Sequence, residues 1–253
     1  MPKMWRENRN MKIFLAGLSD KPYVNYSKCK YFLESFVYYK KWEDILIENK
    51  DNFLLDSGAF TYMNNSKENY NFEEYLRKYA DFINEKDIKL FFELDIDSIV
   101  GIEEVERLRK LLEQLTNKKC IPVWHKSRGK DYFIKMCKEY NYVAIGGIIT
   151  REIKQNEFKY FNWFIQVAHQ NNCKIHGLGF TYSKLLKKYN FDTVDSTSWK
   201  SGGRFAQIHR FTGSEMNLKV INKKKYRVKD YKALDIFNFN EWCKYQKYME
   251  EKQ

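Results

Sequence analysis

The sequence predicts an α/β fold, a (β/α)8 barrel of the TIM type, from three observations. Short apolar runs typical of buried strands alternate with segments of helical periodicity along most of the chain. No G-x-G-x-x-G fingerprint follows the first apolar run, which argues against a dinucleotide-binding fold. Successive runs end in polar residues or glycines, as barrel strands do at their active-site ends. The residues that end them are Asp56, Asp95, His125, Gly146, His176 and Asp195.

The order of these runs gives the expected elements. Asn71 with Glu74 three positions later has the spacing of a helix capping box. The expected strands are 11–18, 53–56, 91–95, 121–125, 142–147, 174–179 and 191–195, with 205–211 as the closing strand. The expected helices are 27–49 with a break near Lys40, one opening at Asn71, and 102–116, 130–140, 156–171, 182–189 and 237–250.

Length and composition indicate one folded domain. The 253 residues are 43% hydrophobic and 17% aromatic, which excludes a disordered chain. Residues 1–10 are expected to form an N-terminal extension, and residues 11–253 one barrel domain that includes a C-terminal basic segment and helix. No apolar stretch is long enough to span a bilayer and no secretory leader is evident. We therefore expect a cytoplasmic protein without a membrane partner, in the host cytoplasm if a phage encodes it.

Cysteine spacing and net charge bear on cofactors and partners. The five cysteines are scattered without C-x-x-C spacing, which fits reduced thiols and argues against a zinc knuckle. We expect no metal and no other cofactor. The net charge of +12 favours a polyanionic partner such as nucleic acid, although AT-rich coding would also enrich lysine. The sequence leaves a homo-oligomer open.

Asp56 and Asp195 are the first candidates for catalysis. Two carboxylates on different strand ends can divide the work of glycosyl transfer, one attacking carbon and the other moving protons. Each alone is also typical of a helix N-cap or a turn. Their placement at matching strand ends favours function.

Asp95, Asp97 and a glycine pair offer recognition chemistry. Asp95 and Asp97 have the chemistry of Mg²⁺ ligands, but without a further acidic or histidine cluster we favour recognition of an amide or amidine edge. For Asp97 a loop cap is the better alternative. Gly146 and Gly147 allow close approach of a ligand to the backbone, and equally fit a tight turn.

Two histidines and one basic loop complete the set. His125 and His176 fit either proton carriers or hydrogen-bonded core histidines, and the sequence assigns neither a catalytic role. In the loop 198–204, Lys200 and Arg204 beside glycines suit phosphate contacts, or an ordinary solvated loop.

Four motifs in order resemble one family. Leu55–Phe60 is similar to the D-S-G-G-F signature of the tRNA-guanine transglycosylases that insert queuine or archaeosine precursors, and Ala144–Ile148 to their I-G-G-L turn. His176–Gly179 resembles the segment before their nucleophile, and Asp195–Ser198 stands where the nucleophilic Asp lies. The resemblance covers roughly residues 11–210.

The resemblance implies specific roles. Asp195 would attack C1′ of a guanosine sugar and expel guanine, and Asp56 would be the general acid/base toward the incoming 7-deazaguanine. Asp95 would bind the Watson–Crick edge of the base. The other residues that the resemblance brings to the substrate are Ser57, Gly58, Phe60, His125, Gly146, Gly147, His176 and Gly179, with Phe60 placed to stack on a base.

Departures from the family pattern favour its phage and bacterial branch, which modifies DNA. Ala59 replaces the second glycine, Thr197-Ser198-Trp199 replaces P-T-R, and the C-x-C-x-x-C…H zinc site is absent from this short chain. The leading hypothesis is a DNA-guanine transglycosylase that uses free preQ0 or a related base on a flipped or melted guanine. The basic segment 219–232, with Lys223, Lys224, Lys225 and Arg227, would follow the DNA backbone.

Three alternatives remain open at the level of sequence. A tRNA-guanine transglycosylase would keep the chemistry and change the polymer. A nucleoside or DNA glycosidase would use water as the acceptor. A non-catalytic nucleic-acid-binding barrel would keep its function without Asp56 and Asp195.

Overall fold

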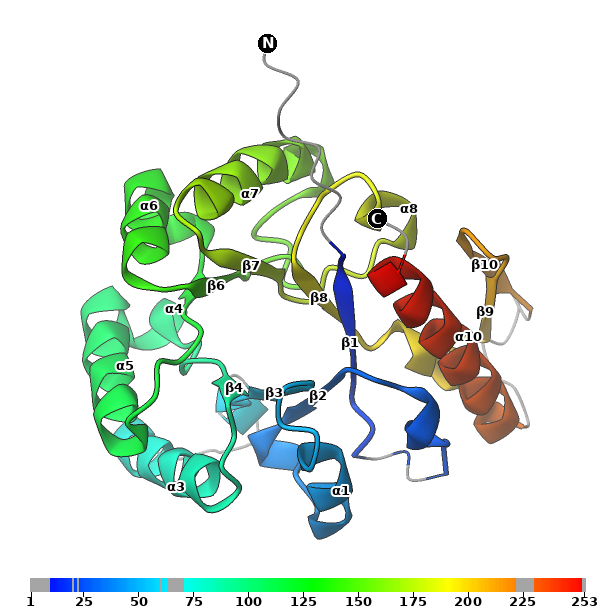
Figure 1. The fold of residues 1–253 in the computed structure, drawn as a ribbon, viewed down its shortest axis with the longest axis horizontal. Coiled ribbons are helices and arrows are strands. Elements are labelled where there is room, and N and C mark those ends of the chain that lie inside the picture. Colours follow the sequence, from blue (N-terminus) through cyan, green and yellow to red (C-terminus); the bar gives the residue numbers. More distant parts are fainter. Residues whose placement is uncertain are drawn as a thin grey trace.

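The computed structural model describes residues 10–19, 21, 23–59, 61–62, 71–221 and 230–251, except for the side chain of Arg204. Eight parallel strands form one sheet in the order β4-β3-β2-β1-β8-β7-β6-β5. Its two edges meet at a parallel bridge between Phe92 and Ile121, where the Ile121 N–H donates to the Phe91 carbonyl over 2.8 Å. The predicted (β/α)8 barrel is thereby confirmed (Figure 1). The strands are β1 Lys12–Ala16, β2 Phe32–Ser35, β3 Phe53–Asp56, β4 Leu90–Phe91, β5 Val123–Trp124, β6 Tyr142–Ile145, β7 Lys174–Gly177 and β8 Thr193–Ser196.

Helices surround the ring of strands (Figure 1). The α-helices are α1 Asp44–Ile47, α3 Phe72–Glu85, α4 Asp97–Val100, α5 Ile102–Thr116, α6 Gly129–Glu139, α7 Phe161–Gln170, α8 Ser183–Leu186, α9 Ser201–Phe205 and α10 Tyr231–Glu251. Short 3₁₀ helices are η1 Tyr26–Lys28, η2 Phe36–Tyr38, η3 Lys41–Glu43, η4 Lys126–Arg128, η5 Gln155–Tyr160 and η6 Ser198–Lys200. Within the described ranges, each helix is too short or too polar to cross a lipid bilayer.

The strands bury side chains on both faces, in two separate cores. Because side chains alternate along a strand, every second residue points into the barrel and the others point toward the helices. The inner core consists of Phe14, Ala16, Tyr31, Leu33, Leu54, Phe92, Ile121, Val123, Tyr142 and Ala144. The larger outer core lies between the strands and the helices and includes Ile13, Leu15, Phe53, Leu55, Val143, Ile145, Ile175 and Val194.

The prediction of a helix over 27–49 is wrong, because this segment contains strand β2. Tyr31 and Leu33 enter the inner core and Phe32 the outer core, as in a parallel strand that is buried on both faces. Phe32 and Phe36 are four positions apart, which imitates helical spacing. Only Asp44–Ile47 of the predicted helix is α-helical.

The prediction of 205–211 as the closing strand is also wrong. β9 Gln207–Phe211 pairs antiparallel with β10 Met216–Val220 in a separate two-stranded sheet. The barrel closes instead through β8, which pairs with β1 from Lys12 opposite Thr193 to Leu15 opposite Ser196. Since β2 supplies a strand that the sequence analysis missed, no further strand is needed.

Most other helices lie where the periodicity predicts them. Asn71 caps α3, with its side-chain oxygen accepting from the Glu74 N–H over 3.0 Å. α5 has the predicted bounds. The terminal helix α10 begins at Tyr231, before the predicted start at residue 237, and lies beside β1 and the β9–β10 hairpin (Figure 1).

Gln246 of α10 joins this helix to the barrel. Its buried amide nitrogen donates to the carbonyls of Ile13 (2.7 Å) and Tyr31 (3.1 Å), and its oxygen accepts from the Lys30 N–H (2.7 Å). The Tyr31 carbonyl also accepts from the Leu15 N–H over 3.0 Å, as the last bond of the ladder between β1 and β2. The Ile13 carbonyl and the Lys30 N–H lie beyond this ladder, and Gln246 supplies a partner to both.

We expect Gln246→Ala to lower the free energy of unfolding by about 2–4 kcal/mol, because it leaves buried backbone groups without partners. Urea denaturation measures this loss. Lys247→Ala is the control, since the Lys247 side chain is 74% exposed and its loss should change stability by less than about 0.5 kcal/mol. Equal effects of both substitutions would contradict the role of Gln246.

Candidate functional site

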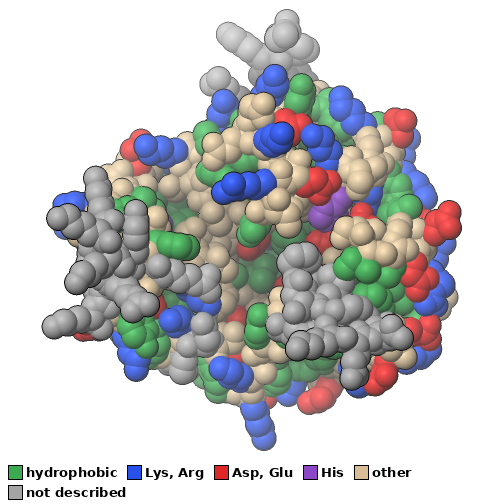
Figure 2. Space-filling model, turned by 180° about the vertical axis from the view of Figure 1, so that it is seen from behind, with side chains coloured by type: hydrophobic (Ala, Val, Ile, Leu, Met, Phe, Trp, Pro, Cys, Tyr) green, Lys and Arg blue, Asp and Glu red, His purple; other side chains and the backbone are tan. Residues whose placement is uncertain are grey.

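The carboxyl ends of the eight strands meet at one mouth of the barrel. Asp56 follows inward-facing Leu54 by two positions, and His125 likewise follows Val123. The ring of His176 lies against that of Phe92 inside the barrel. Figure 2 shows the face opposite to that in Figure 1, hollowed at its centre, with hydrophobic and acidic side chains inside and Lys and Arg side chains at several places around it. The structure thus brings the predicted strand-end residues together.

Asp195 on β8 is buried and held by one oxygen. Its Oδ1 accepts from the Gly179 N–H at 2.5 Å and lies 3.2 Å from Nε2 of His176. Nδ1 of His176 lies 2.7 Å from the Thr193 hydroxyl, which also contacts the Tyr142 hydroxyl. Among the described residues, every hydrogen bond to the Asp195 side chain is made to Oδ1. This arrangement orients the carboxylate and leaves Oδ2 for another partner.

Gly179 can hold Asp195 because it has no side chain. Its φ of +68° is left-handed, and a Cβ there would lie 2.3 Å from Cδ1 of Ile149. Any other residue would displace the N–H that Asp195 accepts. Gly179 therefore acts on the candidate nucleophile through its backbone.

Asp56 at the end of β3 has a strongly shifted pKa. Burial and the charges of Asp95 and Asp195 raise the pKa of Asp56 to about 7, against the opposing effect of the Gly58 N–H. A carboxyl group with this pKa is populated in both protonation states near neutral pH. Asp56 can therefore both donate and accept a proton.

Ser57 and Gly58 shape the turn after Asp56. The Ser57 carbonyl accepts from the Tyr75 hydroxyl (2.5 Å), and its Oγ lies 3.4 Å from the Ala59 nitrogen. Gly58 has a φ of +66°, and a Cβ there would lie 2.4 Å from Oγ of Ser35. The contacts of both residues are thus within the protein, and their predicted contact with substrate stays a prediction.

His125 lies between two carboxylates at the other side of the mouth. Its Nε2 is 2.6 Å from Oδ1 of Asp95, and its Nδ1 is 2.8 Å from Oε2 of Glu152. Burial lowers the pKa of His125, but the hydrogen bonds to Asp95 and Glu152 and the charges of Asp95 and Asp97 outweigh burial and raise it to about 9. His125 is therefore an imidazolium at neutral pH.

Asp95, Asp97 and His125 each bring one potential metal-ligand atom within 4.8 Å of the others. These atoms already have partners of opposite charge. His125 pairs with Asp95, and the guanidinium of Arg128 donates from Nε to Asp97 over 2.9 Å. We therefore interpret the cluster as an ion-pair network and do not assign a metal site.

A buried network of charged side chains connects this side of the mouth with the surrounding helices. Glu93 is completely buried, accepts from the Val123 N–H over 2.7 Å, and pairs with Arg128 (3.2 Å) and Arg109 (3.3 Å). Since Arg128 also holds Asp97, the network connects β4, the loop after β5 and α5. The sequence analysis did not single out Glu93.

Lys200 lies in a different environment from the exposed phosphate contact that the sequence predicted. It is 8% exposed, and a Cβ at Gly17 would lie 2.9 Å from its Nζ. Its charge acts on Glu34, which accepts from the N–H groups of Leu18 (2.6 Å) and Ser19 (3.3 Å). Burial nevertheless raises the pKa of Glu34 to about 7.

Glu34 and Glu152 are the acidic residues near the mouth that sequence reasoning missed. Phe32-Leu33-Glu34 carries the same signal as the other strands, an apolar run that ends in a carboxylate. No comparable signal marks Glu152. Phe60, Lys223, Lys224, Lys225 and Arg227 lie outside the described residues, as does the side chain of Arg204.

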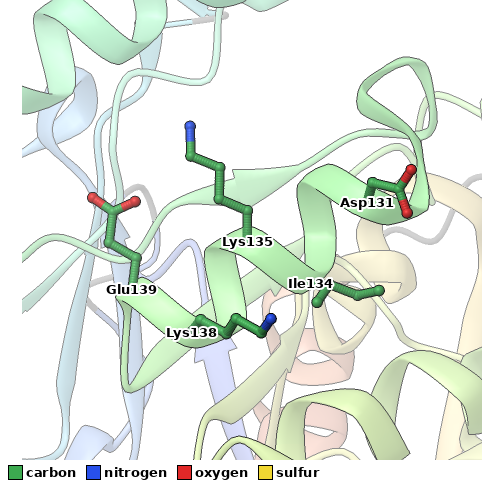
Figure 3. Close-up of a pocket in the computed structure, with 5 residues that line it drawn as sticks. All are labelled: Asp131, Ile134, Lys135, Lys138 and Glu139. Carbon is green, nitrogen blue, oxygen red and sulfur yellow. The ribbon is translucent and has the colours of Figure 1, made fainter.

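A second depression lies on the outer surface and has no features of a reaction site. Its lining residues all come from α6, and their side chains point in different directions (Figure 3). They are Asp131, Ile134, Lys135, Lys138 and Glu139. The barrel mouth, where polar groups converge, is the better candidate.

Comparison with known proteins leaves the activity open. No protein-family model matches the sequence, and no curated protein matches it. Solved structures that match include the carboxyl transferase domain of Rhizobium etli pyruvate carboxylase with 3-hydroxypyruvate, with a TM-score of 0.47, 14% identity, and coverage of 96% of this chain and 49% of that chain. The same domain with pyruvate matches with a TM-score of 0.47 and 13% identity, and the match covers 97% of this chain and 50% of that chain. This chain thus spans at most half the length of these two matched chains, and at such similarity we draw no functional argument from them.

The pKa of Asp56 predicts a pH-dependent stability. Because folding raises this pKa to about 7, the protein loses stability as the pH rises from near the unfolded pKa toward about 7. Asn cannot ionise, so we expect Asp56→Asn to gain stability relative to wild type, by on the order of 1 kcal/mol or more, between about pH 5 and about pH 8. Urea denaturation at both pH values measures the difference.

Asp81→Asn is the control for this prediction, because Asp81 is an exposed carboxylate on α3. Its free energy of unfolding should equal that of wild type at both pH values. If the free energy of unfolding of Asp56→Asn changes with pH as that of wild type does, folding does not raise the pKa of Asp56.

Proposed function

We propose that the protein is a glycosyltransferase that exchanges guanine in DNA for a 7-deazaguanine base such as preQ0, through a covalent bond between Asp195 and the sugar. The observation that carries this proposal is the pairing of two different carboxyl groups at one mouth. Asp195 is fixed by the Gly179 N–H with one oxygen left over, whereas Asp56 has a pKa of about 7. One group suits attack on carbon and the other proton transfer.

The first half of the reaction releases guanine. Oδ2 of Asp195 attacks C1′ of the sugar while the bond between C1′ and the base nitrogen breaks, and its electron pair leaves with the base. The leaving guanine takes a proton from Asp56, which becomes a carboxylate. The product is an ester between Asp195 and the sugar.

The second half reverses these steps with the new base. Asp56 removes the proton from the ring nitrogen of the incoming 7-deazaguanine, and this nitrogen attacks C1′. Asp195 leaves as a carboxylate, and Asp56 is again protonated. The anomeric configuration is retained because two displacements occur.

Asp95 and the charge of the chain support a guanine-like base in a nucleic acid. A carboxylate accepts hydrogen bonds from adjacent N–H groups, which guanine and its 7-deaza analogues present on one edge. The net charge of +12 and the Lys-rich sequence 222–229 favour a polyanionic substrate. Without a zinc-binding C-x-C-x-x-C…H motif, DNA is favoured over tRNA.

We expect the protein to incorporate labelled preQ0 or guanine into DNA, and Asp195→Ala to lower the rate at least ~10³-fold. Asp56→Asn should lower it at least ~10²-fold, because it removes the proton carrier. The assay compares duplex DNA, single-stranded DNA and tRNA. Asp192→Asn provides a matched control, since this carboxylate precedes β8 and pairs with His169 at the opposite end of the barrel (2.9 Å).

The outcomes separate the alternatives. Incorporation into tRNA alone would identify the polymer as RNA. Release of guanine without incorporation would identify a glycosidase with water as acceptor. Binding of DNA by wild type, Asp56→Asn and Asp195→Ala alike, with no exchange on any polymer, would contradict the proposed transferase and leave a binding protein.

A further inference from the structure

We propose that Glu152, in the loop after β6, is a positioning residue that holds His125 between two carboxylates and thereby fixes Asp95 for recognition of the substrate base. The inference deepens the proposed function, and it rests on that function for the role of Asp95. It adds a residue that lies outside the predicted set, and it gives His125 a defined task.

The hydrogen bonds of His125 define its protonation state. Nδ1 faces Oε2 of Glu152 at 2.8 Å, and Nε2 faces Oδ1 of Asp95 at 2.6 Å. Ionised carboxylates only accept hydrogen bonds, so each ring nitrogen must donate a proton. Only the doubly protonated imidazolium satisfies both contacts. The His125 ring thus joins Glu152 and Asp95 through two hydrogen bonds.

Glu152 is itself held in place. Its second oxygen, Oε1, accepts from the Ser127 N–H at 3.2 Å. The loop that carries Glu152 begins at Gly147, whose carbonyl accepts from the Ile153 N–H at 3.0 Å. The carboxylate therefore connects the loop after β6 with the loop after β5, on which His125 lies.

The glycine pair after β6 makes room for this arrangement. A Cβ at Gly146 would lie 2.7 Å from Cε1 of His125, and a Cβ at Gly147 would lie 2.7 Å from Oε2 of Glu152. Gly147 also has a φ of +77°. Gly146 and Gly147, which the sequence analysis considered for contact with a ligand, therefore leave the space that His125 and Glu152 occupy.

The other charges near His125 are already balanced. Asp97 also raises the pKa of His125, but Arg128 donates to Asp97 over 2.9 Å and to Glu93 over 3.2 Å. Lys126, next in the chain, pairs with Glu157 at 2.6 Å. Among the described residues, Asp95 and Glu152 are the two side chains that hydrogen-bond to the ring.

Oδ2 of Asp95, the oxygen that does not contact His125, is the atom that we assign to base recognition. With Oδ1 of Asp95 fixed by the imidazolium, Oδ2 can accept an N–H from a base. The chemistry fits a purine-like base with adjacent N–H donors and disfavours one whose edge presents an acceptor there.

Histidine NMR of the intact protein tests the arrangement without any reaction. In wild type we expect both ring nitrogens of His125 to be protonated at neutral pH, with a titration near pH 9. Glu152→Gln keeps the shape and removes the charge, and should lower the titration midpoint by about 1 unit or more. Glu157→Gln is the matched control, because Glu157 lies in the same loop region and contacts Lys126 instead of His125.

Base binding and exchange kinetics test the consequence. For guanine and preQ0 we expect Glu152→Gln to weaken binding and raise KM by about tenfold with a much smaller change in kcat, and Glu157→Gln to leave both unchanged. Circular dichroism verifies that each variant is folded. Asp95→Asn should lose base binding irrespective of Glu152.

The results separate this inference from the proposed function. An unshifted titration of His125 in Glu152→Gln, or unchanged base affinity beside active wild type, would overturn the inference while the transferase stands. Without any exchange activity, a shifted titration together with weaker binding of guanine would still support the positioning role and leave the transferase rejected.

Discussion

The closed hydrogen-bonded ring of parallel strands is the constraint on which the candidate site depends. Strand pairing fixes which residues share a level, and alternation along each strand fixes which of them face inward. The bridge between Phe92 and Ile121 brings the ends of β4 and β5 together, and so brings Asp95 within reach of His125. Because every strand runs in the same direction, Asp56 and Asp195 face the same mouth.

The barrel brings three carboxyl groups to one mouth, where like charges repel, and each of the three has different neighbours. Asp195 is hydrogen-bonded by a backbone N–H, and Asp95 pairs with an imidazolium. Asp56 accepts from the Gly58 N–H, but burial together with the charges of Asp95 and Asp195 raises its pKa to about 7. Three chemically identical side chains therefore differ in their partners and in their orientation. Such differentiation is what a reaction with a nucleophile and a separate proton carrier requires.

The sequence predicts the barrel and its mouth well, because apolar runs that end in polar residues mark parallel strands directly. It misses β2, where Phe32 and Phe36 have helical spacing, and it assigns closure to residues 205–211, of which Gln207–Phe211 pairs with β10 instead. Glu152 could not be predicted, since its role arises only when the loops after β5 and β6 meet. The buried position of Lys200 likewise depends on packing against Gly17, far away in the chain.

The most direct test of the central claim is to trap the covalent intermediate. The protein is incubated with guanine-containing DNA, denatured, and digested, and mass spectrometry locates the modified residue. The account predicts a protein–DNA adduct on Asp195 that disappears when excess free guanine or preQ0 is added. An adduct on another residue, or no adduct with active enzyme, would contradict the role assigned to Asp195.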